Sequence, residues 1–386
     1  MKKSTSYLQI LYTLLTITLP VTSIYVSPFP GIDFGTMCIL LFSILMLINM
    51  PSIKLDSYLI VLLAYFFIIT IPLIIGITTN NYSSTSSVLN RLFRFILLII
   101  MMVGFGYTTY FDEEKYTKVL RVASLIVASY AIIQSITFKF FGFKLRNIFG
   151  PERGGAVFST SLGEYETVYR PPSFFLEPSG VSYFLTPFLC YVLFRKRKMS
   201  GWDILSAMII TLGIVVSTSG QGLFIIAICW GIWGLRQMRS QRITGLLIIL
   251  ICSFLFLRSY DLNYTISRIT TNEELNAVDA RSGGYELVKE LPGNSIVFGT
   301  GYGNYVESIY YSSFAEILFC TGIVGLLIVL LFYLSLFIKG SLFQKVLVIS
   351  SLVLMAGGGI FTPTYLCFYL PMLLPMHHKE DDNNES

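Results

Sequence analysis

Arginine, proline and glutamate meet in one short string, RPPSFFLEPSG, which runs from Arg170 to Gly180. A proline is tolerated in the first turn of a helix and fixes the entry of the chain. Pro178 is therefore predicted to begin a helix and to leave Glu177 at its positively polarised end. Two interpretations are open. Glu177 compensates the helix dipole and Arg170 is an interfacial anchor, or the two form a fixed anion and cation at the lip of an outward-facing cavity.

A second constellation starts at Arg281, in the string RSGGY, and continues as GTGYGNY from residue 299 to residue 305. Closely spaced glycines let backbone amides approach and cradle an anionic group. Gly299, Gly301 and Gly303 are therefore candidate substrate-binding residues. No lysine-bearing helix follows as in a P-loop, so the alternative is a set of turn-forming glycines.

Arg91 and Arg94 lie three residues apart near the start of an apolar run. This spacing places both on one face of a helix. Arginine in such a position binds phosphate in a bidentate manner or extends to lipid head groups, and both interpretations are kept.

The elements that must position these residues are membrane helices. Of the 386 residues, 54% are hydrophobic and only 13% charged, and the mean hydropathy is +0.70, which is not the composition of a water-soluble protein. A spanning helix takes about 20 apolar residues, so about twelve spans fit in a single membrane domain, 1–386. The apolar runs are 7–26, 35–53, 58–78, 89–108, 119–138, 179–194, 202–218, 221–235, 243–257, 314–338, 345–361 and 364–376. The last run is short and contains Pro371, so a half-helix or an interfacial segment is the alternative to a span.

Lysine and arginine gather in alternate loops, which sets the orientation. With a cytoplasmic N-terminus, sixteen of the 27 fall inside: Lys2, Lys3, Lys54, Lys115, Lys118, Arg121, Arg195, Lys196, Arg197, Lys198, Arg236, Arg239, Arg242, Lys339, Lys345 and Lys379. The C-terminal tail, 377–386, is then cytoplasmic as well. The same topology puts two long loops, 139–178 and 258–313, on the external face, and loops of that length commonly carry function. Part of the second, from Thr271 to Glu290, is predicted to be helical and to break at Pro292.

Composition also excludes several functions. A net charge of +5, spread over short loops, does not favour nucleic-acid binding. All six cysteines lie in apolar runs, so no disulfide is expected. Both histidines belong to the tail, which excludes a histidine base or ligand elsewhere. No D-x-D pair occurs, so neither a metal nor another cofactor is expected.

Several strings together resemble the bacterial O-antigen and capsule repeat-unit polymerases of the Wzy type. These are R-x-x-S-x-F-x-E-P-S at the start of a span, the turn from Ser217 to Gln221, and G-x-G-x-G followed by SFAEILFCTGIVG. The related O-antigen ligases place a His-Asn pair before the last of these strings. Here the region from Tyr310 to Phe314 has no histidine, which favours a polymerase over a ligase.

The resemblance implies an all-helical protein of the bacterial cytoplasmic (inner) membrane that joins polyprenyl-pyrophosphate-linked oligosaccharide units. Arg170 and Arg281 match the external-loop arginines of that family, and Glu177 matches its motif carboxylate. Besides the lipid bilayer and the lipid-linked glycan, a chain-length regulator protein is an expected partner.

The same chemistry follows from the predicted location of the loops. No nucleotide sugar or ATP is available outside, so a glycosyl donor must arrive already activated by a lipid-linked pyrophosphate. The protein then has to stabilise the departing charge, for which Arg170, Arg281 and the pair Arg91 and Arg94 are candidates. Glu177 is the candidate base, or else a substrate-binding group. A ligase-like transferase of lipid-linked glycan and a flippase or other transporter of polysaccharide units are the alternatives.

Overall fold

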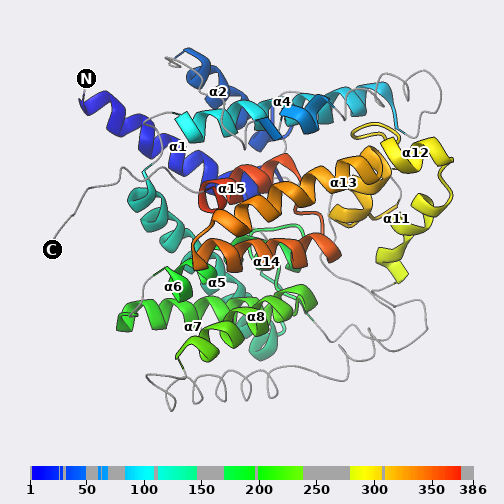
Figure 1. Ribbon diagram of the computed structural model, residues 1–386. Helices are drawn as coiled ribbons and strands as arrows, with labels where there is room; N and C mark the ends of the chain where they lie inside the picture. Colours follow the sequence, from blue (N-terminus) through cyan, green and yellow to red (C-terminus); the bar gives the residue numbers. More distant parts are fainter. Residues whose placement is uncertain are drawn as a thin grey trace.

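The protein is all-helical in the part of the chain that the computed structural model describes, and that part contains no strand. The described residues are 2–25, 27–28, 32–48, 60–61, 63–67, 83–107, 112–145, 169–195, 199–237, 279–306 and 309–374. The helices are α1 (Lys2–Thr22), α2 (Phe34–Ile48), α4 (Thr85–Tyr107), α5 (Glu113–Phe141), α6 (Pro178–Phe194), α7 (Gly201–Val216), α8 (Gly220–Gln237), α11 (Asp279–Lys289), α12 (Gly293–Phe298), α13 (Ser313–Lys339), α14 (Leu342–Gly357) and α15 (Pro363–Leu373). Figure 1 shows their arrangement.

Apolar runs of the sequence become helices wherever they fall in the described residues. The clearest difference is α5, which begins at residue 113 rather than 119. Asp112 caps it, because its carboxylate accepts a hydrogen bond from the Lys115 amide at 3.1 Å, and two glutamates follow in the first turn. The predicted run 243–257 lies outside the described residues, as does most of 58–78.

Two helices, α5 and α13, are long and apolar enough to cross a membrane, and α1, α2, α6, α7, α8 and α14 contain shorter apolar stretches. Along α5, Val122, Ile126 and Ile133 share one face and are 57%, 54% and 49% exposed. A face of that kind is unfavourable in water and suits lipid. The all-helical chain is thus consistent with a membrane protein.

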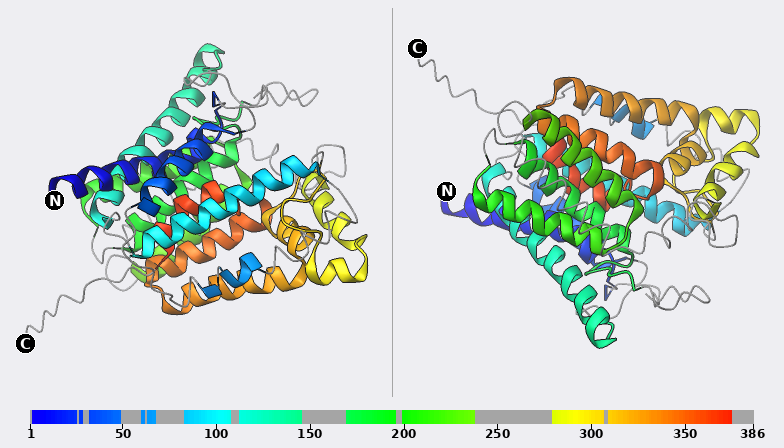
Figure 2. Two further views of the ribbon diagram at one scale, coloured as in Figure 1. Left: turned by 90° about the horizontal axis from the view of Figure 1, so that it is seen from above. Right: turned by 90° about the horizontal axis from the view of Figure 1, so that it is seen from below.

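The helix ends form two opposite faces of the bundle. The N-terminus of α1 lies at one end, and α11 and α12 lie at the other (Figures 1 and 2). Polar contacts join ends that the predicted alternation assigns to the same face. On the predicted inner face Arg195, after α6, pairs with Glu113 at 3.1 Å. On the predicted outer face the Ser313 hydroxyl, at the start of α13, donates to the Gly358 carbonyl at 2.7 Å.

The last helix, α15, is an interior element. It is eleven residues long and buried from Leu366 to Leu373, and it packs against α1, α4, α6 and α14. The Gln344 side chain, at the start of α14, donates to the Leu374 carbonyl at 3.0 Å and so satisfies the end of α15. Of the predicted alternatives, the half-helix fits this arrangement and the interfacial segment does not.

The second long loop ends in a helical hairpin seated in a break of α13. The expected break at Pro292 is present, but a further helix, α12, begins directly after it. Gly322 interrupts α13 with φ 66°, and a Cβ at that position would lie 2.3 Å from the Val297 carbonyl oxygen. The Thr300 and Gly301 amides donate to the Phe319 and Cys320 carbonyls, both at 2.9 Å. The carbonyls freed by the break are thus satisfied by the segment after α12.

Candidate functional site

The RPPSFFLEPSG segment is anchored on α5 through Ser173. This residue has a left-handed backbone, φ 54°, which is unfavourable for serine. Its amide donates to Gln134 Oε1 at 2.8 Å, its hydroxyl donates to the Val127 carbonyl at 2.8 Å, and its carbonyl accepts from Gln134 Nε2 at 3.3 Å. All three bonds are buried, so they hold the strained turn in place.

The two phenylalanines of the motif pack rather than bind. Phe174 stacks on Tyr130 of α5, with ring centroids 4.6 Å apart. Phe175 lies over Gly180. A Cβ added at Gly180 would come within 2.7 Å of the Phe175 Cβ. Buried hydrogen bonds therefore explain the serine of the motif, and close packing explains its aromatic residues and its glycine.

Arg170 holds the turn between α7 and α8. Its Nε donates to Thr218 Oγ1 at 2.9 Å and its Nη2 to the Thr218 carbonyl at 3.2 Å. Thr218 is itself left-handed, with φ 53°. The arginine is half-buried, so its charge lies at the boundary of the bundle.

The neighbouring Tyr169 is not a candidate base. Burial, with a contribution from Tyr130, raises the pKa of Tyr169 to about 12. That phenol therefore stays protonated near neutral pH and is not a base.

Glu177 stands directly before α6, and Pro178 is the first residue of that helix, as the sequence predicts. The glutamate is exposed and has an extended backbone. Its Oε2 accepts a hydrogen bond from the Ser179 hydroxyl at 3.1 Å. The side chain makes no capping bond to the helix amides, so the dipole-compensating role is electrostatic at most and the carboxylate stays accessible.

A buried polar pair that sequence reasoning missed lies between α6, α8 and the end of α14. The Tyr183 hydroxyl donates to Gln221 Oε1 at 2.8 Å, and both side chains are buried. A Cβ on Gly358 would come within 1.8 Å of the Tyr183 hydroxyl oxygen, and one on Gly357 within 2.1 Å of Gln221 Nε2. The two glycines are what allow α14 to end against this pair. The only sequence signal was the Ser217 to Gln221 turn.

The same glycines connect this region to the start of α13. Ser313 donates to the Gly358 carbonyl through its amide at 2.9 Å and through its hydroxyl at 2.7 Å. Its hydroxyl oxygen also accepts from the Phe361 amide at 2.9 Å. Tyr310 lies above them, exposed, with its hydroxyl 3.4 Å from the Gly357 carbonyl. These hydrogen bonds join the start of α13 to the end of α14, which lies against Gln221.

Arg91 is part of a separate network that docks the glycine-rich turn onto α4. Its Nη1 donates to the Gly303 carbonyl and, at 3.1 Å, to Ser83 Oγ. The guanidinium carbon lies 3.9 Å from the centre of the Tyr305 ring, a cation–π contact. Glu316 of α13 is close enough to interact with it electrostatically. This arginine therefore joins three separate parts of the chain.

The glycines of the GTGYGNY string have positive φ angles of 80°, 105° and 75° at Gly299, Gly301 and Gly303. The Gly299 amide donates to the Ser295 carbonyl, and the Gly301 amide donates to the Cys320 carbonyl. A phosphate cradle made of these amides would have to break those bonds, so the arrangement favours the turn-forming interpretation. Substrate binding by the three glycines stays a prediction.

Arg94 pairs with a residue that sequence reasoning did not single out. Its Nη2 lies 2.9 Å from Asp33 Oδ2, and the aspartate side chain is only 2% exposed. Asp33 Oδ1 also accepts from the Thr36 amide at 2.6 Å at the start of α2. Arg94 thus neutralises a buried carboxylate and joins α4 to α2. An acid just before an apolar run was the available signal.

Arg281 belongs to the first turn of α11, and the position of its side chain lies outside the described residues. The helix itself is fixed on α13: Gly284 is buried against Tyr311, where a Cβ would lie 2.8 Å from the ring. The Ser312 hydroxyl donates to the Tyr285 hydroxyl oxygen at 3.1 Å. The role of Arg281 stays a prediction.

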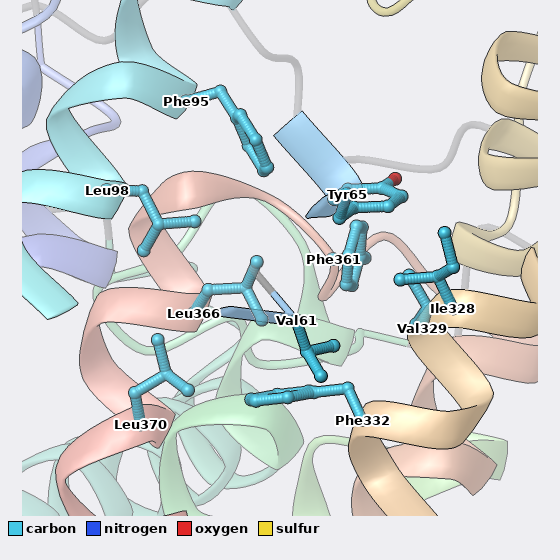
Figure 3. Close-up of a pocket in the computed structure, with 10 residues that line it drawn as sticks. All are labelled: Val61, Tyr65, Phe95, Leu98, Ile328, Val329, Phe332, Phe361, Leu366 and Leu370. Atoms are coloured by element: carbon cyan, nitrogen blue, oxygen red, sulfur yellow. The ribbon is translucent and has the colours of Figure 1, made fainter. Parts of the chain in front are cut away.

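A cavity in the described part of the bundle is apolar. Figure 3 shows side chains from residues 61–65, α4, α13 and α15 pointing toward one another, Phe95, Phe332 and Leu370 among them. Its volume of about 20 Å³ holds about one water molecule, so it is a packing gap and no substrate site. In the described ranges no three His, Cys, Asp or Glu side chains could hold a metal ion, and metal independence stays a prediction.

Comparison with known protein families, with curated proteins and with solved structures finds no match to this chain. The functional conclusion therefore depends on the residues and on the geometry described above.

Proposed function

We propose that the chain is a membrane glycosyltransferase of about twelve spans that polymerises polyprenyl-pyrophosphate-linked oligosaccharide units at the outer face of a bacterial cytoplasmic membrane. The observation that carries this proposal is the pair of polar groups in one motif. Arg170 is half-buried and held at the turn between α7 and α8, and Glu177 is exposed at the start of α6. The remaining residues of the motif are used in packing.

The proposed reaction needs little beyond charge and position. The oxygen of an acceptor hydroxyl attacks the anomeric carbon of the donor, a glycosidic bond forms, and the bond from that carbon to the pyrophosphate oxygen breaks. The proton of the hydroxyl passes to the Glu177 carboxylate, and the polyprenyl pyrophosphate leaves with its charge stabilised by Arg170. Arg281, on α11 at the same end of the bundle, is the candidate second cation.

A strain that lacks the protein tests this proposal against its two alternatives. Loss of a polymerase leaves single repeat units on the surface lipid, because assembly and export of a unit do not require joining. Loss of a flippase leaves lipid-linked units inside and none on the surface. Loss of a ligase leaves lipid-linked polymer that is never attached. Either of the last two phenotypes would contradict the proposal.

Complementation with variants then tests the site itself. Arg170→Lys keeps the charge but loses the two-pronged fit, so shorter chains are expected, and Arg170→Ala should leave single units. Arg195→Ala is the control, since Arg195 is an arginine at the opposite face that pairs with Glu113 and whose side chain is 34% exposed. It should restore the normal chain-length distribution at equal expression. Normal polymer from Arg170→Ala would show that the assigned site is wrong.

A further inference from the structure

The amide of Gln221 is a buried hydrogen-bonding group with unused capacity. Its Oε1 accepts from Tyr183, whereas Nε2 has no hydrogen-bond partner among the residues that the structure describes. The side chain is only 6% exposed. An amide is nearly symmetrical, so either orientation leaves one of its two polar atoms unpaired. A buried unpaired amide is costly, and its retention calls for an explanation.

The surroundings of this amide are neutral. Tyr183, Gly357 and Gly358 lie against it, and the nearest cation of the motif, Arg170, is bound to Thr218, three residues earlier in the chain. Recognition of a pyrophosphate requires cationic groups. An uncharged oxygen atom, such as a sugar hydroxyl or an N-acetyl carbonyl, is what a lone amide donor can bind.

The wall beside the amide is made of backbone with almost no side chains. Residues 357 to 359 are three consecutive glycines at the end of α14. A Cβ on Gly357 would collide with the amide, but one on Gly359 would meet nothing within 4 Å. Open space therefore lies at the Gly359 end of this wall.

A chain of aromatic contacts leads from the amide to Glu177. The Tyr183 ring meets the Tyr365 ring edge-on, with centroids 5.5 Å apart, and Tyr365 is close enough to Glu177 for an electrostatic interaction. Aromatic rings of this kind are common partners of sugar rings because the C–H face of a sugar is apolar. The rings of Tyr183 and Tyr365 thus connect Gln221 to Glu177, whereas Arg170 donates its hydrogen bonds described above to Thr218.

We infer that Gln221, oriented by Tyr183, forms the subsite for the acceptor sugar, with Nε2 donating to a neutral oxygen of that sugar. The inference rests on the proposed function and adds a division of the site. The donor pyrophosphate binds at the arginine, and the acceptor binds between Glu177 and Gln221. Gln221 contacts the substrate, and Tyr183 is a positioning residue.

The test uses the full-length protein in lipid nanodiscs and two substrates that can be varied separately. The donor is the lipid-linked repeat unit, and the acceptor is the same oligosaccharide released from its lipid by mild acid. Gln221→Leu should raise KM for the soluble acceptor about tenfold, the effect of one hydrogen bond to a neutral group, and leave KM for the donor unchanged. Tyr183→Phe should raise the same KM by a smaller factor.

Two matched controls separate binding from folding. Thr211→Val removes a different buried hydrogen bond, which Trp230 Nε1 of α8 donates to Thr211 Oγ1 of α7 at 3.0 Å, and should leave both KM values unchanged. Gly357→Ala should mimic Gln221→Leu because the new methyl displaces the amide, whereas Gly359→Ala should behave as wild type. An unchanged acceptor KM in Gln221→Leu, or equal behaviour of the two glycine variants, would overturn the inference.

A direct binding measurement tests the sugar subsite independently of the polymerase proposal. Saturation-transfer NMR with the soluble oligosaccharide should show binding to wild type and weaker binding to Gln221→Leu. If the wild-type protein binds the oligosaccharide in this way but forms no polymer, the polymerase proposal fails and the sugar subsite stands. If polymer forms and the two proteins bind the oligosaccharide equally, the subsite fails alone.

Discussion

The arginine network at the start of α4 and the arginine before α6 differ in what surrounds them. Arg91 binds Ser83 and Gly303 and covers the Tyr305 ring. The neighbouring Asn304 side chain is also paired: its Oδ1 accepts from the Ser83 amide at 3.2 Å, and its nitrogen donates to the Thr300 carbonyl at 3.0 Å. These contacts attach the glycine-rich turn, residues 299–305, to α4.

The region around Arg170 contains polar groups that are exposed or not fully hydrogen-bonded. Glu177 is exposed, and both Gln221 Nε2 and the Ser182 hydroxyl are buried with no hydrogen-bond partner in the described part of the chain. An arginine on the predicted outer face is therefore a weak signal by itself. The pairing state of its neighbours distinguishes a docking contact from a candidate site.

Loss of the Arg170 side chain should have the largest effect on activity. A charge contact to a leaving group in a partly dry site contributes about 2.7 to 4 kcal/mol, so Arg170→Ala should polymerise about 100- to 1,000-fold more slowly. Rates of polymer formation in nanodiscs check this, with Arg195→Ala as the control. An effect below about tenfold would place Arg170 in the same class as Arg91.

Replacement of Glu177 by Gln tests whether the exposed carboxylate takes a proton. A general base contributes about 100-fold or more, so Glu177→Gln should lower kcat by about that factor. A hydrogen-bonding role would survive amide replacement with a loss of a few fold. Because the carboxylate makes no capping bond to α6, thermal stability should change little, and a large drop in stability would favour the dipole-compensating role.

Arg91→Met should act on stability rather than on chemistry. It removes two hydrogen bonds and a cation–π contact, which together contribute about 2 kcal/mol. Thermal unfolding in detergent should show a lower midpoint, while the rate per folded molecule stays near wild type. A stable but inactive Arg91→Met protein would mean that this arginine binds substrate after all.

Gly303→Ala should weaken the contact between Arg91 and the glycine-rich turn, with a smaller loss of stability than Arg91→Met. The position has φ 75°, and a Cβ there would lie 2.8 Å from Arg91 Cδ, so a cost of about 1 to 2 kcal/mol is expected. Gly293→Ala is the control, since a Cβ at that position meets nothing within 4 Å. Equal midpoints for the two variants would show that the turn is not held as described.

Local signals predicted the helices well because apolar runs and caps act over a few residues. Pro178 and the preceding Glu177 were placed correctly at a helix start. The second short helix, α12, was missed, because its stability comes from the break at Gly322 in a distant part of the chain. Sequence separation of that kind leaves no local pattern.

The candidate site was predicted less completely than the helices. Arg170 and Glu177 were found through their motif, but the Gln134 side chain that holds Ser173, from 39 residues earlier, has no signature in the string. Gln221 was visible only as part of a turn. The partner of Arg94, Asp33, was marked only by its place just before an apolar run. Long-range polar pairing is set by tertiary packing, which periodicity and composition do not encode.

The most direct test of the central claim is product formation by the purified protein. The full-length chain in nanodiscs would receive lipid-linked repeat units isolated from the deletion strain, without nucleotide or ATP. We expect chains of two or more units, with one polyprenyl pyrophosphate released for each new glycosidic bond, and both products formed about 100- to 1,000-fold more slowly by Arg170→Ala. Intact lipid-linked units recovered without any pyrophosphate release, under conditions where the protein is folded, would contradict it.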